Sequence, residues 1–260
     1  MWNAIRAEFI KLTTTRSFYI TSLLYFLFGI GLAGMVGFGT RQLAANPEIA
    51  EANADVALDA QGLLFAVDVV TVIFMVQAVL MVTSEYSRNQ STSTFTAIPQ
   101  RWRVVVAKWL LYAVLAAIIS LVTVLVALYL GKFIAGDAAA SMDIWGDEHV
   151  QRALWAKPIA IMLSVTFAMG MAWLLRNTAG TLLVVLVWSF GLESILGVTI
   201  PKVGPYISGY GPFNHLAAFQ STMPVNEGPD WGATTSGLYF AAWALAFFVA
   251  GAIVMNKRDA

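Results

Sequence analysis

The sequence predicts an all-α polytopic membrane protein with six transmembrane helices, an N-terminal interfacial helix and a re-entrant or extracellular hairpin between helices five and six. Hydrophobic residues make up 59% of the 260 residues and charged residues only 12%, about half the charged share of a soluble domain. The mean hydropathy is +0.73. The apolar residues are also gathered into runs of about 20 or more, the length needed to cross a bilayer. Lipid is therefore the expected solvent for most of the chain.

Six apolar runs meet this length requirement. The first has no charged residue, and at about 1.5 Å per residue it reaches about 33 Å. It is too long for the apolar region of a signal peptide and no A-x-A site follows it, so it is expected to stay uncleaved. Arg176-Asn177 is the only polar break in the stretch from 157 to 197 and is expected to be a tight turn between spans four and five. The expected spans are residues 17–38, 62–83, 104–130, 157–175, 178–197 and 237–255.

The positive charges predict the orientation of these spans, because Lys and Arg accumulate on the cytosolic side. With the N-terminus inside, the opposite side holds only Arg41, Lys132, Arg152, Lys157 and Lys202. The cytosolic side then holds Arg6, Lys11, Arg16, Arg88, Arg101, Arg103, Lys108, Arg176, Lys257 and Arg258. Both termini are therefore expected in the cytosol.

Two segments outside the spans have unusual patterns. In residues 1–16, the side chains of Trp2, Ile5, Phe9 and Leu12 share one helical face, which is typical of a helix lying in the cytosolic interface. A plain extension of span one is the alternative. Residues 198–236 are too apolar for a solvated loop and too rich in Pro and Gly for a span. Such backbone is tolerated at membrane depth only under cover of protein or a water-filled cavity, so a re-entrant or interfacial hairpin is expected.

The first span carries small residues at a four-residue spacing, Gly29, Ala33 and Gly37. A stripe of this kind lets another helix approach closely. The neighbour is either a helix of the same chain or one of a second subunit.

The sequence offers no catalytic pattern. It has no cysteine, so thiolate chemistry and disulfides are excluded, and no GxxxxGK[ST] motif for nucleotide phosphates. His149 and His215 lie on separate segments, and the net charge of zero argues against nucleic acid as a partner. We expect a non-enzymatic chain that binds neither metal nor cofactor itself.

The candidate path residues within the expected spans are Asp68, Gln77 and Glu193. A charge at the bilayer centre costs about 2.5–3.5 kcal/mol on insertion scales, so such residues are candidates for a translocation path or gate. Asp68 and Glu193 fall in the outer third of the bilayer, where Lys157 is at a depth to reach either. The structural alternative is that the carboxylates bind the hairpin backbone and Lys202. Gln77 is either an interhelical hydrogen-bond partner or a path-lining residue.

The polar segment 84–103, SEYSRNQSTSTFTAIPQRWR, is the only cytosolic connection of any length. Residues 94–98 are expected to form a short helix that ends at Pro99, with Phe95 and Ile98 on one face. Two interpretations of this segment stay open: either Phe95 and Ile98 dock into a groove of a partner protein, or the segment is a plain solvated loop.

Three stretches in this order resemble one known family. AEFIKLTTTRS (7–17), TSEYSRNQSTSTFTAIPQRWRVVVAK (83–108) and VWSFGLESILG with the hairpin after it (187–212) resemble the permease subunits of type-2 ABC exporters, particularly the actinobacterial kind. The resemblance implies that residues 2–14 form an elbow helix and that residues 85–99 hold a coupling helix for a separate ATPase. The coupling residues that it implies are Glu85, Tyr86, Arg88, Thr94, Phe95, Ile98, Pro99 and Arg101. Asn89 stands where the family has glycine, so the local turn differs from the usual pattern.

The resemblance also implies the partners and the function. Two ATPase subunits, which hold ATP and Mg²⁺, would drive two permease subunits, as a homodimer or with a sister chain, in the plasma membrane of a bacterium. The exported substrate would be a drug, antibiotic, peptide or lipid, and an amphipathic compound suits the aromatic and Met-rich spans. The alternatives are a self-contained channel or secondary carrier, for which the charged residues lie too shallow, and a membrane module that senses or scaffolds.

Overall fold

The computed structural model describes residues 2–46, 60–87, 101–140, 142–221, 223–225, 227–229 and 231–257. In these ranges the regular elements are helices, without a strand. In chain order they are α1 (Trp2–Thr14), α2 (Arg16–Ala45), α4 (Ala60–Val69), α5 (Thr71–Ser87), α7 (Arg101–Ala135), the 3₁₀ helix η1 (Gly136–Ala139), α8 (Glu148–Leu175), α9 (Thr178–Val187), the π-helix η2 (Trp188–Leu192), α10 (Glu193–Thr199), α11 (Gly204–Gly209), α12 (Pro212–Ser221) and α13 (Ala233–Lys257).

Six helical stretches are long and apolar enough to cross a membrane, as expected from the sequence. They are Arg16–Ala45, Ala60–Ser84, Trp102–Ala139, Glu148–Leu175, Thr178–Thr199 and Ala233–Met255. These lengths and compositions are compatible with a multi-pass membrane protein.

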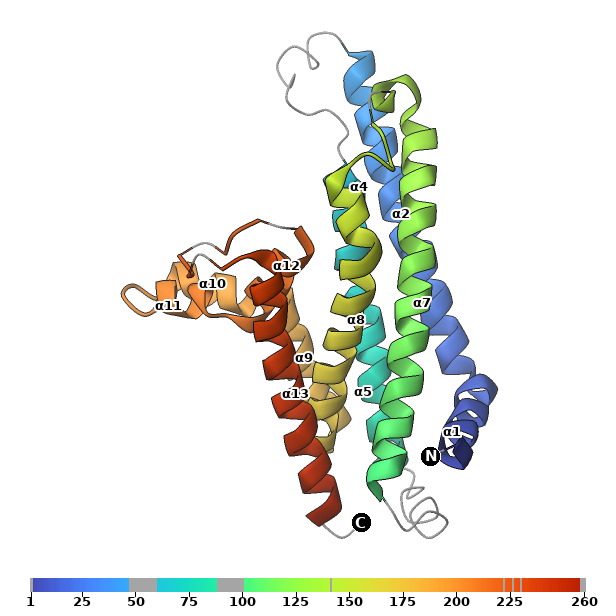
Figure 1. The fold of residues 1–260 in the computed structure, drawn as a ribbon, viewed down its shortest axis with the longest axis vertical. Coiled ribbons are helices and arrows are strands. Elements are labelled where there is room, and N and C mark those ends of the chain that lie inside the picture. Colours follow the sequence, from blue (N-terminus) through green and yellow to red (C-terminus); the bar gives the residue numbers. More distant parts are fainter. Residues whose placement is uncertain are drawn as a thin grey trace.

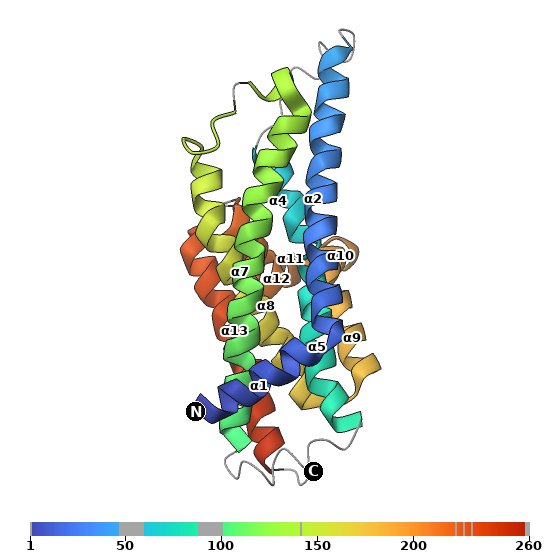
Figure 2. The ribbon, with the colours of Figure 1, turned by 90° about the vertical axis from the view of Figure 1, so that its right-hand side faces the viewer.

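The long helices run side by side, and α10, α11 and α12 gather to one side of them (Figure 1). Helix α1 lies across one end of the bundle (Figure 2). The start of α7 and the ends of α5 and α13 lie at this same end, which we call the α1 end. The first described residues and the last turn of α13 are therefore on the same side of the bundle.

Several helices extend beyond the apolar runs that predicted them. Helix α2 continues from residue 38 to Ala45, and α8 begins at Glu148 instead of residue 157. The side chain of Asp147 caps α8 by accepting a hydrogen bond from the backbone N–H of His149 at 2.7 Å. Hydropathy marks only the part of a helix that suits lipid, whereas backbone hydrogen bonds and caps decide where the helix ends.

Helix α8 is the central helix of the bundle, and it contacts α4, α5, α7, α9, α12 and α13. Its crossing with α13 depends on two glycines. A Cβ on Gly170 would lie 2.6 Å from the backbone of Phe247, and one on Gly251 would lie 2.6 Å from the Gly170 carbonyl oxygen. The two backbones therefore approach more closely than any larger residue would allow.

The small-residue stripe of α2 packs against α7 of the same chain. Gly29, Ala33 and Gly37 are buried. A Cβ on Gly29 would meet Thr123 at 2.8 Å, and one on Gly37 would meet the backbone of Gly131. The question that the sequence left open is answered for this stripe: its neighbour is in the same subunit.

The second span is broken between α4 and α5, at Val70. The N–H of Ile73 bonds to the carbonyl of Val70 across this break at 3.0 Å. Just below it, Phe74 packs on Tyr25 with ring centroids 4.4 Å apart, and its carbonyl accepts a hydrogen bond from the hydroxyl of Tyr112 at 3.1 Å. Helices α2, α5 and α7 are thus joined directly below the break.

Candidate functional sites at the two ends of the bundle

The α1 end holds a buried ion pair between α1 and α7. Lys108 Nζ lies 2.8 Å from Glu8 Oε2, and only 4% and 6% of the two side chains are exposed. Lys11, one turn further along α1, contacts the other oxygen of Glu8 at 2.9 Å. Burial acts to raise the pKa of Glu8, but the charges and hydrogen bonds of the two lysines outweigh it and hold that pKa below its ordinary value. The carboxylate therefore stays ionised and fixes α1 to the start of α7.

A cavity of about 460 Å³ adjoins this ion pair. Its wall includes Gln77 of α5, whose side-chain oxygen accepts a hydrogen bond from Ser17 of α2 at 2.8 Å. Gln77 is therefore an interhelical hydrogen-bond partner that also lines this cavity, whereas its role in a translocation path stays a prediction. The cavity is lined by Glu8, Lys11, Leu12, Thr14, Thr15, Ser17, Gln77, Leu80, Met81, Ser84 and Lys108.

The expected coupling residues begin immediately after this cavity. Glu85 and Tyr86 form part of the last turn of α5, and Arg101 is the first residue of α7, but only their backbones are described. Arg88, Thr94, Phe95, Ile98 and Pro99 lie outside the described residues. What the structure contributes is the position of the two helix ends, which both reach the α1 end (Figure 1).

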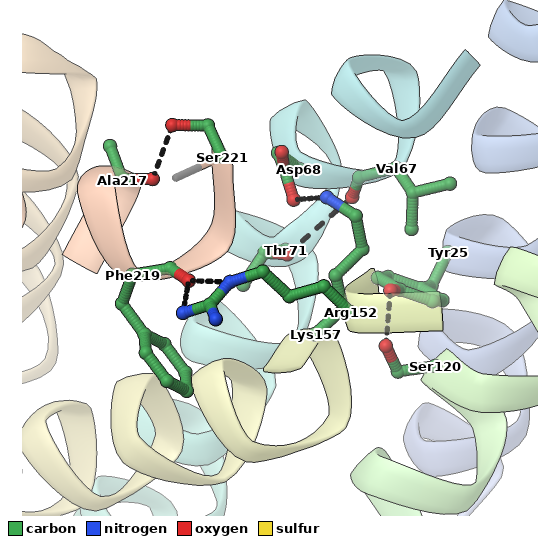
Figure 3. Close-up of polar contacts among 10 residues, drawn as sticks. All are labelled: Tyr25, Val67, Asp68, Thr71, Ser120, Arg152, Lys157, Ala217, Phe219 and Ser221. Carbon is green, nitrogen blue, oxygen red and sulfur yellow. Dashed lines mark hydrogen bonds and ion pairs between the residues drawn. The ribbon is translucent and has the colours of Figure 1, made fainter. Parts of the chain in front are cut away.

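A second, partly buried ion pair joins α8 to α4 (Figure 3). Lys157 Nζ of α8 contacts Asp68 Oδ1 of α4 at 2.5 Å, with 4% and 28% of the two side chains exposed. Lys157 was expected to reach either intramembrane carboxylate, and it reaches Asp68. The pair fixes α4, just above the break at Val70, to the central helix.

Glu193 instead binds the hairpin backbone, which was the structural alternative for this residue. Its carboxylate accepts hydrogen bonds from the N–H groups of Phe213 at 3.1 Å and Asn214 at 2.9 Å, and from Trp188 Nε1 at 2.5 Å. The two backbone donors belong to the first turn of α12, where N–H groups lack partners within the helix. No ion pair with Lys202 forms among the described residues.

Arg152 is a connecting residue that sequence analysis missed. Its guanidinium donates two hydrogen bonds, of 3.0 and 2.8 Å, to the carbonyl of Phe219 in α12 (Figure 3). It also lies 4.9 Å from the ring centroid of Trp155 and 5.4 Å from that of Phe219. Trp155, one turn further along α8, is the only local signal that would have indicated this stacking.

His215 of α12 is the second missed residue, and it is completely buried. Its ring nitrogens lie 3.1 Å from Ser236 Oγ and 3.1 Å from the carbonyl oxygen of Gly209. Trp231 stacks on the imidazole at 5.0 Å, and Tyr239 packs edge-on at 4.7 Å. Burial lowers the pKa of His215, although the bond to Gly209 acts in the opposite direction. The arrangement is that of a neutral histidine that joins the hairpin to α13.

Comparisons with known proteins do not add a family to this description. No protein-family model and no curated protein matches the chain. Among the described residues, no three His, Asp or Glu side chains cluster in a way that would hold a metal ion. The fold and composition are compatible with a helical multi-pass membrane protein, and its described residues hold the Glu8–Lys108 pair toward one end and the Asp68–Lys157 pair toward the other.

Proposed function

We propose that the chain is the membrane-spanning permease subunit of an ATP-driven ABC exporter. It forms the translocation path for an amphipathic substrate such as a drug, antibiotic, peptide or lipid. The observation that carries the proposal is the buried Glu8–Lys108 pair, which joins α1 to α7. Helix α7 begins at Arg101, just after residues 85–99, the stretch that resembles a coupling helix. In this interpretation, α1 is the elbow helix, the α1 end faces the cytosol, and residues 198–236 form the re-entrant or extracellular hairpin.

The polar segment is the proposed contact with the ATPase. It is held between α5 and α7, and both helices form part of the wall around the cavity next to Glu8. A push on the segment would therefore act on α1, α5 and α7 together, because the buried ion pair resists separation of α1 from α7. Glu85, Tyr86, Arg88, Thr94, Phe95, Ile98, Pro99 and Arg101 are the residues proposed to transmit it.

The Asp68–Lys157 pair is the proposed outer closure. It holds α4 to α8, while α5, beyond the break at Val70, continues to the cytosolic segment. A displacement of α5 would therefore change the angle between α4 and α5 at Val70 and pull on the contact between Asp68 and Lys157. ATP drives this change only if the ATPase binds ATP more tightly in one conformation than in the other. ATP and Mg²⁺ are held by two ATPase subunits, and a second permease, identical or related, completes the path in the plasma membrane.

Purification from native membranes in a mild detergent tests the proposal. A P-loop ATPase is expected in equal copy number, and the number of permease chains distinguishes a homodimer from a heterodimer. The matched control replaces residues 88–100 by a Gly/Ser linker of equal length, which should still insert into the membrane but lose the ATPase. If the native chain is recovered alone under conditions that preserve a known ABC complex, a self-contained channel or carrier replaces the proposal.

A further inference from the structure

A hollow of about 270 Å³ lies between the π-helix η2 and α11. Its lining is mostly apolar and includes the aliphatic residues Leu192 and Leu196 and the aromatic residues Trp188, Tyr206 and Tyr210. The one charged residue in the lining is Glu193. An apolar hollow with few polar groups is the usual form of a small-molecule site, and here the polar group is an acid.

The carboxylate of Glu193 has hydrogen-bond partners but no counter-charge. Its three donors, Trp188 Nε1 and the N–H groups of Phe213 and Asn214, are all neutral. None of the ion pairs among the described residues includes Glu193, although only 4% of the residue is exposed. These donors hydrogen-bond the carboxyl group without supplying a positive charge, so a cation bound in the hollow would meet an acid that has no charged partner among the described residues.

Local backbone geometry holds the acid in this position. Gly191, two residues before Glu193, has φ 94°, and Phe190 is also non-helical, so the chain turns within the π-helix. On the other side, a Cβ on Gly211 would collide with the carboxylate. Gly191 thus permits the turn before Glu193, and Gly211 leaves room for its carboxyl group. The carboxyl group can therefore line the hollow and bind the first turn of α12 at the same time.

The two tyrosines supply aromatic surface that the fold leaves uncovered. Tyr206 is 68% exposed and Tyr210 is 49% exposed. Aromatic faces attract cations, and quaternary ammonium groups are bound in this way in many proteins. Lys202 lines a neighbouring hollow together with Glu227, on which Tyr206 and Tyr210 also border. Lys202 is therefore in the lining of that second hollow and not in the lining of the hollow at Glu193.

We infer that the hollow at Glu193 binds a monovalent organic cation, a quaternary or protonated amine with apolar substituents. The inference rests on the proposed function and deepens it, because it assigns a class of substrate to the path. A metal ion does not suit the hollow, because Glu193 is its only charged residue and both carboxylate oxygens already accept N–H groups. An anion would face the uncompensated carboxylate, whereas a cation finds charge, aromatic faces and apolar contacts together.

The test measures binding of radiolabelled benzyltrimethylammonium to the full chain in lipid nanodiscs, with the signal of empty nanodiscs subtracted. We expect saturable binding of the cation. Neopentylbenzene, in which carbon replaces the charged nitrogen, should compete for the site with an affinity about ten-fold lower than that of the cation. Glu193→Gln should weaken binding about ten-fold, and Glu193→Asp should restore part of it. Tyr206→Leu should weaken binding about three-fold, and its exposed position leaves folding intact.

Matched controls are available for both variants. Asp137→Asn removes an exposed acid elsewhere, and Tyr19→Leu removes an exposed tyrosine of α2; neither should change binding. Equal affinity for the cation and its neutral isostere, or full binding by Tyr206→Leu and Glu193→Gln, overturns the inference. Binding requires no ATPase, so a chain that binds the cation but never copurifies with an ATPase contradicts the proposed function and leaves the cation site standing.

Discussion

Lys108 of α7 contacts Glu8 of α1 at 2.8 Å, and both side chains are almost completely buried. The two residues are 100 positions apart in the sequence, so this contact is a tertiary link. Lys11 adds a second positive charge to the same carboxylate. Helix α1 is therefore attached to the bundle by charge as well as by the buried side chains of Ala4 and Leu12, whereas Trp2 and Phe9 stay exposed.

Glu8→Gln should destabilise the protein by about 3–5 kcal/mol, because removal of one partner leaves a buried charge uncompensated. Glu8→Gln combined with Lys108→Met should recover much of this loss, because no unpaired buried charge remains. Chemical unfolding in bicelles measures both values. Additive effects of the two substitutions would show that the pair is not an energetic unit.

Asp68→Asn tests the ion pair toward the opposite end. It leaves Lys157 buried without its partner, and we expect a loss of about 3–5 kcal/mol in the free energy of unfolding. The double variant Asp68→Asn with Lys157→Met should recover the lost stability. If the pair serves only to close the path, this double variant should also retain ATP-driven transport, measured in proteoliposomes. A double variant that is stable but inactive would instead place Asp68 in a charge relay, as a carrier requires.

Features that depend on local composition could be predicted from the sequence. Six apolar stretches and the turn at Arg176-Asn177 were predicted from hydropathy, and the structure has six helices long and apolar enough to cross a membrane as well as this turn. The pairing of Lys157 with Asp68 was one of two options, because depth in the membrane limits which charges can meet. The close approach along Gly29 and Gly37 was also predicted, although its partner was not.

Features that depend on long-range packing could not be predicted. Glu8 and Lys108 have no pattern that links them, since each is a single charge near an expected interface. The rings that cover His215, those of Trp231 and Tyr239, come from residues later in the chain, which the sequence around His215 does not indicate. Helix ends beyond the apolar runs were missed because caps such as Asp147 act outside the hydropathy signal.

The crossing of α8 and α13 predicts a strong effect of one methyl group. Gly170→Ala places a Cβ 2.6 Å from backbone atoms of Phe247 and Phe248, so the helices must separate, at a cost of about 1–3 kcal/mol. Gly31→Ala is the matched control, because its Cβ meets nothing within 4 Å. That control should be neutral or stabilise α2 by up to about 1 kcal/mol. Equal unfolding midpoints for the two variants would contradict the crossing.

His215 predicts a loss of stability in mild acid. Its pKa in the folded protein lies below the ordinary value of 6.5, so below about pH 6.5 the unfolded chain takes up a proton that the folded chain resists. The free energy of unfolding should therefore be fully retained above pH 6.5 and fall as the pH decreases through the pKa of the folded state. His215→Phe should reduce this slope, and His149→Gln controls for removal of a histidine. A slope that His215→Phe leaves unchanged would assign the effect to other groups.

Phe95→Ala with Ile98→Ala tests the proposed coupling segment, whose side chains lie outside the described residues. If these two apolar side chains seat in a groove of the ATPase, their loss should lower substrate-stimulated ATP hydrolysis about ten-fold, because buried anchors carry most of the energy of an interface. Thr92→Ala, in the same segment, should have little effect. Membrane insertion should be unchanged in all variants, since the segment lies outside the spans. Stimulation that survives loss of both anchors, in a complex that still contains the ATPase, would require a different contact between the two subunits.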